Sequence, residues 1–291
     1  MLRESCYKLE VDGNWWRFVW IYRYELTAVG VGLAALEAMV LLRGHATAKS
    51  GNPAWTLKES LANIFILWVG QGSRMLTFAW RYGVFAIIHT ASPFRIKTSL
   101  IASLVCYVAL DCIYYWKHRW LHETALGWSM HSVHHSSVEL NLTTSIRSSW
   151  VQRLIDDFFY LPLAAIGFEP ALVLVIADLN LFSQFWIHTR VIGRLGPLEW
   201  FLNTPSSHRV HHAAERPLAD RNYGSTLIVW DRLFGTYAPE PVLEPRYGTE
   251  AGFLGNDPLR VQLAGHLAYF RARSERAKGA EAQRQRDEHE R

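Results

Sequence analysis

Histidines are concentrated in the middle of this chain, at spacings that suit metal binding. The sequence has 291 residues and 13 histidines, and nine of these fall between positions 118 and 212, where even scatter would place about four. They form one HxxxH motif at 118–122 and two HxxHH motifs at 131–135 and 208–212, with a further histidine at 188. Residues three or four apart share one face of a helix, so each motif would gather its imidazoles on one side.

So many imidazoles in one region require a cation. Protonated rings repel one another and unpaired buried rings are costly, whereas a metal ion binds the lone pair of the neutral ring. A tetrahedral ion takes four ligands, so nine histidines indicate two metal ions. The isolated histidines are interpreted as hydrogen-bonded side chains without a metal: His45, His89, His266 and His289.

The ligand type leaves the metal open, because imidazole suits iron, zinc, copper and nickel. Hydrolytic sites usually include carboxylates and face water, whereas these motifs adjoin apolar segments. An apolar substrate with an unactivated C–H bond needs a metal–oxygen oxidant, so we favour iron. The alternatives are a zinc-dependent membrane hydrolase of a lipid ester or amide, and a metal transporter or metal-stabilised membrane scaffold.

Four apolar stretches would position these motifs: 27–42, 61–91, 99–116 and 158–187. An aromatic belt precedes the first stretch and basic residues flank the third. The range 61–91 contains polar residues and predicts one tilted helix or a broken pair. The turn signal at 167–170 divides the last stretch into halves shorter than the roughly 20 residues that a crossing needs, which favours a re-entrant hairpin or one tilted span.

These stretches predict an all-α fold, an integral membrane bundle of about three or four spans plus a re-entrant hairpin, capped by a helical histidine-rich metal domain. The alternative is a soluble protein with buried core helices. We divide the chain into N-terminal membrane helices (1–98), a catalytic domain (99–240) and a polar C-terminal tail (241–291). The third helix should continue through the HxxxH motif, and Asn180, Gln184 and His188 should form a polar stripe on the last apolar helix.

Composition excludes several other classes of protein. The formal net charge is +4, and the tail after residue 270 mixes both signs, so it predicts a solvated helix or disordered end and no nucleic-acid partner. Cys6, Cys106 and Cys112 provide no disulfide framework, which indicates a reducing compartment. No secretory signal is expected at the N-terminus. The sequence has no nucleotide-binding glycine motif, haem-attachment motif or iron–sulfur motif, so electrons would come from a separate protein.

Between residues 111 and 237 the sequence resembles the fatty acid hydroxylase superfamily, also called the sterol desaturase family of membrane di-iron enzymes. The resemblance rests on DCIYYWKHRWLHE at 111–123, WSMHSVHHS at 128–136, HRVHH at 208–212, NYG at 222–224 and WDRLFGTY at 230–237, with Asn141, Thr144 and Arg147 between the motifs. The pattern is most similar to alkylglycerol-monooxygenase-like and bacterial sterol-desaturase-like members. His188 matches an extra histidine that the family often carries before its last motif.

The resemblance implies a membrane-bound, O2-dependent hydroxylase or desaturase that acts on a C–H bond of a lipid or sterol-like substrate. Its metal centre would hold two Fe ions on nine ligands: His118, His122, His131, His134, His135, His188, His208, His211 and His212. Asp111, Glu123 and Asn141 are candidate acceptors for imidazole N–H groups. Arg147 and Arg209 would hold an anionic headgroup or face water. A ferredoxin or cytochrome b5-like donor with its reductase would supply electrons, and the catalytic domain would lie on the cytoplasmic side of the membrane.

Overall fold

The computed structural model describes the backbone of residues 15–43, 55–249, 252 and 254–289, and the side chains of all of these except 15–24, 26 and 276–289. Predictions for Cys6, His45, His289 and the aromatic belt at Trp15, Trp16, Trp20 and Tyr22 therefore concern side chains outside the described set.

The part of the chain that the structure describes is helical and contains no β-strand. Two isolated antiparallel bridges join Leu202 to Leu227 and Ala213 to Tyr247. The all-α prediction is confirmed. The elements follow in this order: α2 (Trp15–Arg43), α3 (Leu57–Leu76), α4 (Phe78–Ala91), α5 (Leu100–Glu123), α6 (Ala125–His135), η1 (Leu142–Ile146), α7 (Trp150–Ile155), η2 (Asp156–Tyr160), α8 (Leu161–Ala165), α9 (Pro170–Ser183), η3 (Gly196–Trp200), α10 (Pro205–His211), α11 (Val229–Leu233) and α12 (Pro258–His289).

Helix α5 connects the apolar part of the molecule to the first histidine motif. Ser99 caps its N-terminus by accepting a hydrogen bond from the backbone N–H of Ala102. The helix continues through the HxxxH motif to Glu123, as predicted. Helices α4, α5, α8 and α9 surround one hydrophobic core, so the helix that carries the motif is held by tertiary packing.

Thr124 sets the junction between α5 and α6. Its extended backbone ends α5, and its hydroxyl accepts a 3.0 Å hydrogen bond from the backbone N–H of Gly127 at the start of α6. A Cβ atom on Gly127 would lie 2.6 Å from both Leu121 Cα and Trp120 O. Glycine at 127 therefore allows α6 to turn back closely against α5, which places the first two histidine motifs side by side.

The range 61–91 forms a broken pair of helices. Helices α3 and α4 meet at Thr77, which caps the end of one and precedes the other. The last apolar stretch forms α8 and α9 around the predicted turn, where Gly167 adopts a positive φ of 103° and Pro170 begins α9. Helix α9 ends at Ser183, so His188 lies beyond it and the predicted stripe of Asn180, Gln184 and His188 on one helix is wrong.

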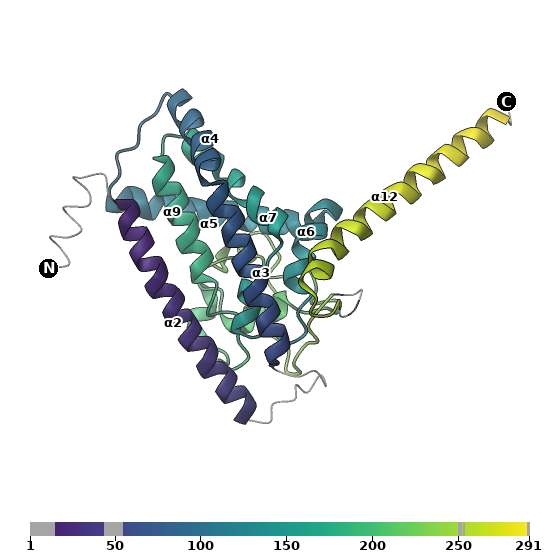
Figure 1. The fold of residues 1–291 in the computed structure, drawn as a ribbon, viewed down its shortest axis with the longest axis horizontal. Coiled ribbons are helices and arrows are strands. Elements are labelled where there is room, and N and C mark those ends of the chain that lie inside the picture. Colours follow the sequence, from purple (N-terminus) through teal and green to yellow (C-terminus); the bar gives the residue numbers. More distant parts are fainter. Residues whose placement is uncertain (1–14, 44–54, 250–251, 253, 290–291) are drawn as a thin grey trace.

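Among the described residues, α5 is the one helix long and apolar enough to cross a membrane, and the apolar α9 is shorter. The prediction of three or four spans is therefore not confirmed. One physical reason is the break at Thr77, which divides the second apolar stretch into helices of 20 and 14 residues. The last helix, α12, begins against α6, and its C-terminal part extends away from the body (Figure 1).

Candidate metal centre

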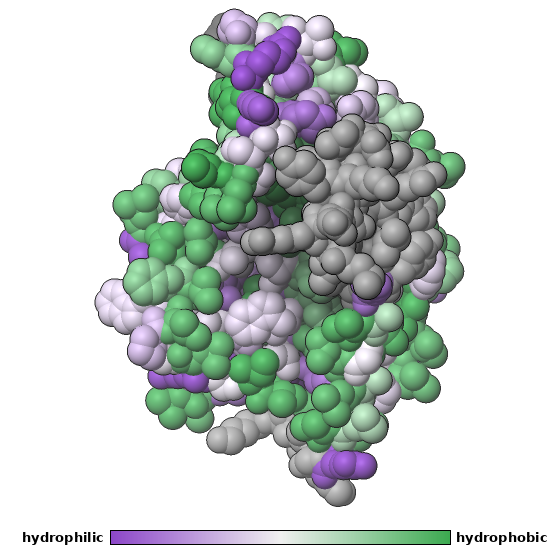
Figure 2. Space-filling model, turned by 90° about the vertical axis from the view of Figure 1, so that its left-hand side faces the viewer, coloured by the Kyte–Doolittle hydropathy of each residue, from purple (hydrophilic) through white to green (hydrophobic). Residues whose placement is uncertain are grey.

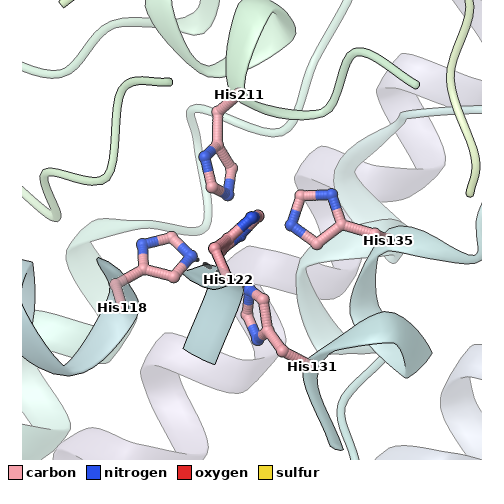
Figure 3. A group of neighbouring side chains, drawn as sticks. All are labelled: His118, His122, His131, His135 and His211. Carbon is pink, nitrogen blue, oxygen red and sulfur yellow. Dashed lines mark hydrogen bonds between the residues drawn. The ribbon is translucent and has the colours of Figure 1, made fainter. Parts of the chain in front are cut away.

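The structure brings all nine histidines of the predicted set together in two adjacent groups. The first group contains His118, His122, His131, His135 and His211, whose rings converge in Figure 3. The second contains His134, His188, His208 and His212. Within each group the candidate ligand nitrogens lie within 4.8 Å of one another, and every ring is buried except that of His134, which is partly exposed.

The two HxxHH motifs divide their histidines between the groups in opposite ways. On α6, the i and i+4 residues belong to the first group and the i+3 residue, His134, belongs to the second. At α10, the i and i+4 residues belong to the second group and the i+3 residue, His211, belongs to the first. Residues at i and i+4 lie along one line of a helix, and i+3 projects beside them. Each motif therefore contributes to both groups.

Backbone carbonyls fix the orientation of four rings. Nδ1 of each of these rings lies 2.7–3.0 Å from a carbonyl oxygen: His118 from Tyr223, His134 from Arg147, His188 from Gln184 and His211 from Arg221. A carbonyl accepts but cannot donate, so Nδ1 carries the proton and Nε2 keeps its lone pair. His131 Nδ1 lies 3.1 Å from Gln152 Oε1, and His122 Nδ1 lies 3.3 Å from Asp220 Oδ1. These acceptors orient six rings and leave the lone pair of each Nε2 available to bind a metal ion.

The distances between the inward nitrogens fit a shared ion. In the first group, Nε2 atoms of His118 and His131 are 2.9 Å apart, and Nε2 atoms of His122, His135 and His211 are buried with no hydrogen-bond partner. In the second group, three pairs of Nε2 atoms approach to 2.8–3.2 Å. Two nitrogens that bind one ion at about 2.1 Å and at right angles lie about 3 Å apart. The donor set in each group therefore fits a bound metal ion.

Burial keeps these rings neutral. Desolvation lowers the pKa of His134 to about 4 and that of His211 to about 3. Desolvation, and then the neighbouring rings, lowers the pKa of His135, His208 and His212 well below the usual range. A neutral imidazole has the free lone pair that a metal requires, so the protein does not have to release protons from these rings at neutral pH.

Asp111 does not orient an imidazole. It is fully buried, and its carboxylate accepts hydrogen bonds of 2.8–3.3 Å from other donors: Asn180 Nδ2, Trp230 Nε1 and the backbone N–H groups of Thr226 and Leu227. Seven residues separate it from His118, which is about 10 Å along a helix axis, so its contacts are with α9, α11 and the chain before α11 instead of the rings.

Glu123 and Asn141 also have other roles in these contacts. Glu123 accepts a 2.8 Å hydrogen bond from Arg119 Nε, and 46% of its side chain is exposed, so it is a solvated charge at the end of α5. Asn141 caps η1 by accepting from Thr143 N at 3.0 Å, and its amide donates to Glu139. These contacts correct the prediction that Glu123 orients a ring, and they assign Asn141 to the start of η1.

Arg147 and Arg209 are buried, so neither faces water. The Arg147 guanidinium donates to Val133 O, Ser136 Oγ and Asn63 Oδ1. The Arg209 guanidinium contacts Glu240 and donates to backbone carbonyls. Both side chains support the segments that carry histidines.

Sequence reasoning missed the groups that orient the rings. Four of them are main-chain carbonyls, which any residue type can provide and which a sequence therefore does not reveal. The other two, Gln152 and Asp220, lie outside the histidine motifs and the other motifs of the sequence. The NYG motif at 222–224 did contain a signal, because Tyr223 supplies the carbonyl that holds His118.

The segment with this geometry also matches known proteins. Residues 103–236 match the fatty acid hydroxylase family. Alkylglycerol monooxygenase of Xenopus tropicalis is 45% identical over 157 residues, which are 54% of this chain and 35% of that protein. The human alkylglycerol monooxygenase is 44% identical over 157 residues, which are 54% of this chain and 35% of that protein. Ornithine lipid hydroxylase OlsE of Rhizobium tropici is 32% identical over 128 residues, which are 44% of this chain and 39% of that protein.

The chain thus spans little more than a third of the length of these relatives. No solved structure matches it. Both histidine groups fall inside the matched segment. The part of the chain that matches the fatty acid hydroxylase family, residues 103–236, therefore contains all nine clustered histidines.

Proposed function

We propose that this chain is a membrane-bound, non-haem di-iron monooxygenase that hydroxylates a C–H bond of a lipid with dioxygen. The observation that carries the proposal is the pair of adjacent histidine groups, with five and four converging ring nitrogens. Relatives whose names specify monooxygenase or hydroxylase activity on lipids support hydroxylation ahead of desaturation. The whole reaction consumes one dioxygen, two electrons and two protons, and it yields one hydroxylated lipid and one water.

Two irons held by these groups would supply the redox chemistry that converts dioxygen into an oxidant strong enough to attack a C–H bond. The chain's own residues hold and orient the ligands. Carbonyl acceptors keep the Nδ1 protons on the outer side of the rings, and burial excludes water from the inner side. Within the described residues, both groups consist of neutral imidazoles without a carboxylate, so the ligands leave the charge of the metal ions uncompensated.

The apolar surface supports integration into a membrane. Large hydrophobic side chains are exposed on α2, α3, α4, α5 and α9, including Leu36, Trp68, Trp80, Ile101 and Leu179. The described residues on the face in Figure 2 are largely hydrophobic. We place α5 across the bilayer and the exposed apolar faces of the other helices against lipid. The two histidine groups would then lie at the C-terminal end of α5, on the cytoplasmic side.

We infer that a separate protein delivers the electrons. A ferredoxin, or a cytochrome b5-like protein with its reductase, would provide two electrons per turnover. The test is to purify the chain in detergent, load it with Fe(II) under anaerobic conditions and count metal ions per chain. The loaded protein is then given membrane lipids, a reduced ferredoxin and isotopically labelled dioxygen.

Two irons per chain and one labelled oxygen atom in a lipid product are expected. A zinc hydrolase would instead act without oxygen and place oxygen from water in its product. Turnover with NAD(P)H and oxygen alone would contradict the need for a donor protein. A matched variant that lacks His134 separates metal-dependent turnover from contaminating activity.

A further inference from the structure

The segment 221–231 presents two backbone carbonyls to the first histidine group. Tyr223 O lies 2.8 Å from His118 Nδ1, and Arg221 O lies 2.9 Å from His211 Nδ1. The rings of the second group that bond to carbonyls use other segments, since His134 bonds to Arg147 O and His188 to Gln184 O. The position of segment 221–231 therefore sets the orientation of two ligands of the first group.

One carboxylate holds this segment in place. Asp231 is fully buried, and each of its oxygens accepts a 2.7 Å hydrogen bond from the backbone: Oδ1 from Tyr223 N and Oδ2 from Gly224 N. Oδ1 also accepts from Thr236 Oγ1 at 2.7 Å. The N–H and the C=O of Tyr223 thus connect Asp231 to His118 through a single residue.

The local backbone is built around this carboxylate. A Cβ atom on Gly224 would lie 2.9 Å from Asp231 Oδ2 and 2.4 Å from Leu227 O, so a side chain at 224 would push the carboxylate away. Asn222 adopts a positive φ of 56°, and its amide donates to Ser207 O and Ala238 O. The segment is therefore fixed on both sides of Tyr223, and Asp231 makes the central contact.

We propose that Asp231 is a positioning residue that orients His118 and His211 through the backbone of residues 221–224, and so sets the metal affinity of the first histidine group alone. This proposal rests on the two-metal centre proposed above. Asparagine at 231 offers one carbonyl oxygen where aspartate offers two, so D231N leaves Tyr223 N or Gly224 N facing an amide NH2 group. Loss of a partner that orients a ligand typically weakens metal binding about 10–100-fold.

The test measures binding of Co²⁺ to the full chain in detergent, by visible absorption and by metal content. Each site is isolated first. H208A/H212A breaks the second group and leaves the first, whereas H118A/H122A breaks the first group and leaves the second. Adding D231N should weaken Co²⁺ binding about 10–100-fold in the H208A/H212A chain and leave it unchanged in the H118A/H122A chain.

A matched control is D157N. Asp157 is also buried, but it pairs with Arg74 and Arg81, away from segment 221–231. D157N should lower the melting temperature without a selective change in either site. Equal weakening of both sites by D231N, or no weakening of the first, would overturn the positioning role. Failure of the unmodified chain to bind two ions would instead refute the proposed function, so the two failures are distinguishable.

Discussion

Nε2 of His118 and Nε2 of His131 lie 2.9 Å apart, although Nδ1 of each ring already faces an acceptor, Tyr223 O and Gln152 Oε1. With both protons on Nδ1, two lone pairs face each other at hydrogen-bond distance and no proton lies between them. Such an arrangement repels unless a cation occupies the space. His134 and His188 repeat it in the second group, with Nε2 atoms 3.2 Å apart and both Nδ1 atoms facing carbonyls.

Metal removal should therefore destabilise the fold. We expect a chelator to lower the melting temperature of the purified chain, because the facing lone pairs lose their cation. At a free metal concentration 100-fold above the Kd, each ion adds about 2.7 kcal/mol of stability. Differential scanning fluorimetry with added Fe(II) or Co²⁺ measures the gain. Mg²⁺, which prefers oxygen ligands, is the control and should give no gain. Equal melting temperatures with and without Fe(II) would argue against a metal centre.

The metal-free protein should lose stability as the pH falls below about 6.5. In the unfolded chain the histidines bind protons near pH 6.5, whereas burial lowers the pKa of His134 to about 4 and that of His211 to about 3 in the folded chain. Between these values the unfolded state holds more protons, so acid favours unfolding, by up to about 3 kcal/mol for His134 and about 5 kcal/mol for His211. Melting temperature against pH after chelation checks this expectation. The metal-loaded protein should resist to lower pH, since the ions compete with protons.

His134→Ala should remove one metal ion and spare the other. The second group would keep three of its four rings, and the first group would keep all five. We expect the iron content to fall from two ions to about one per chain, with loss of hydroxylase activity. His89→Ala is the control, because His89 is outside both groups and should leave the content unchanged. An unaltered iron content in the His134 variant would remove this ring from the ligand set.

Gly127→Ala should damage the metal centre from outside it. The added methyl group would meet Leu121 Cα and Trp120 O at 2.6 Å, so α6 must move away from α5. Such overpacking costs about 1–3 kcal/mol, and the shift would separate the rings of the two helices. Gly72→Ala in α3 is the matched control, because its new Cβ has nothing within 4 Å and should be neutral or slightly stabilising. The melting temperature and the metal content of both variants test this prediction. An unchanged metal content in Gly127→Ala would show that close packing of α6 against α5 is not needed for the metal centre.

The sequence predicts the helices that carry the motifs, because helical periodicity places i, i+3 and i+4 residues together. It does not predict the division into five and four, since that depends on how α6 and α10 face each other. It also misplaces Asp111. The residue shares a helix with His118, but the donors around it come from α9, from α11 and from the segment before α11, which tertiary packing brings in from far along the chain. The stripe of Asn180, Gln184 and His188 fails because α9 ends at Ser183.

The exchange of i+3 histidines between α6 and α10 has a mechanical consequence. Each HxxHH motif contributes rings to both groups, so the backbone geometry of the two helices would set the distance between the two metal ions. No bridging side chain is needed to set that distance. Inserting or deleting a single residue inside either HxxHH motif would rotate the histidines that follow it by about 100° around the helix axis. Both histidine groups would then lose ligands. The spacing of the three histidines within each HxxHH motif is therefore constrained by both histidine groups at the same time.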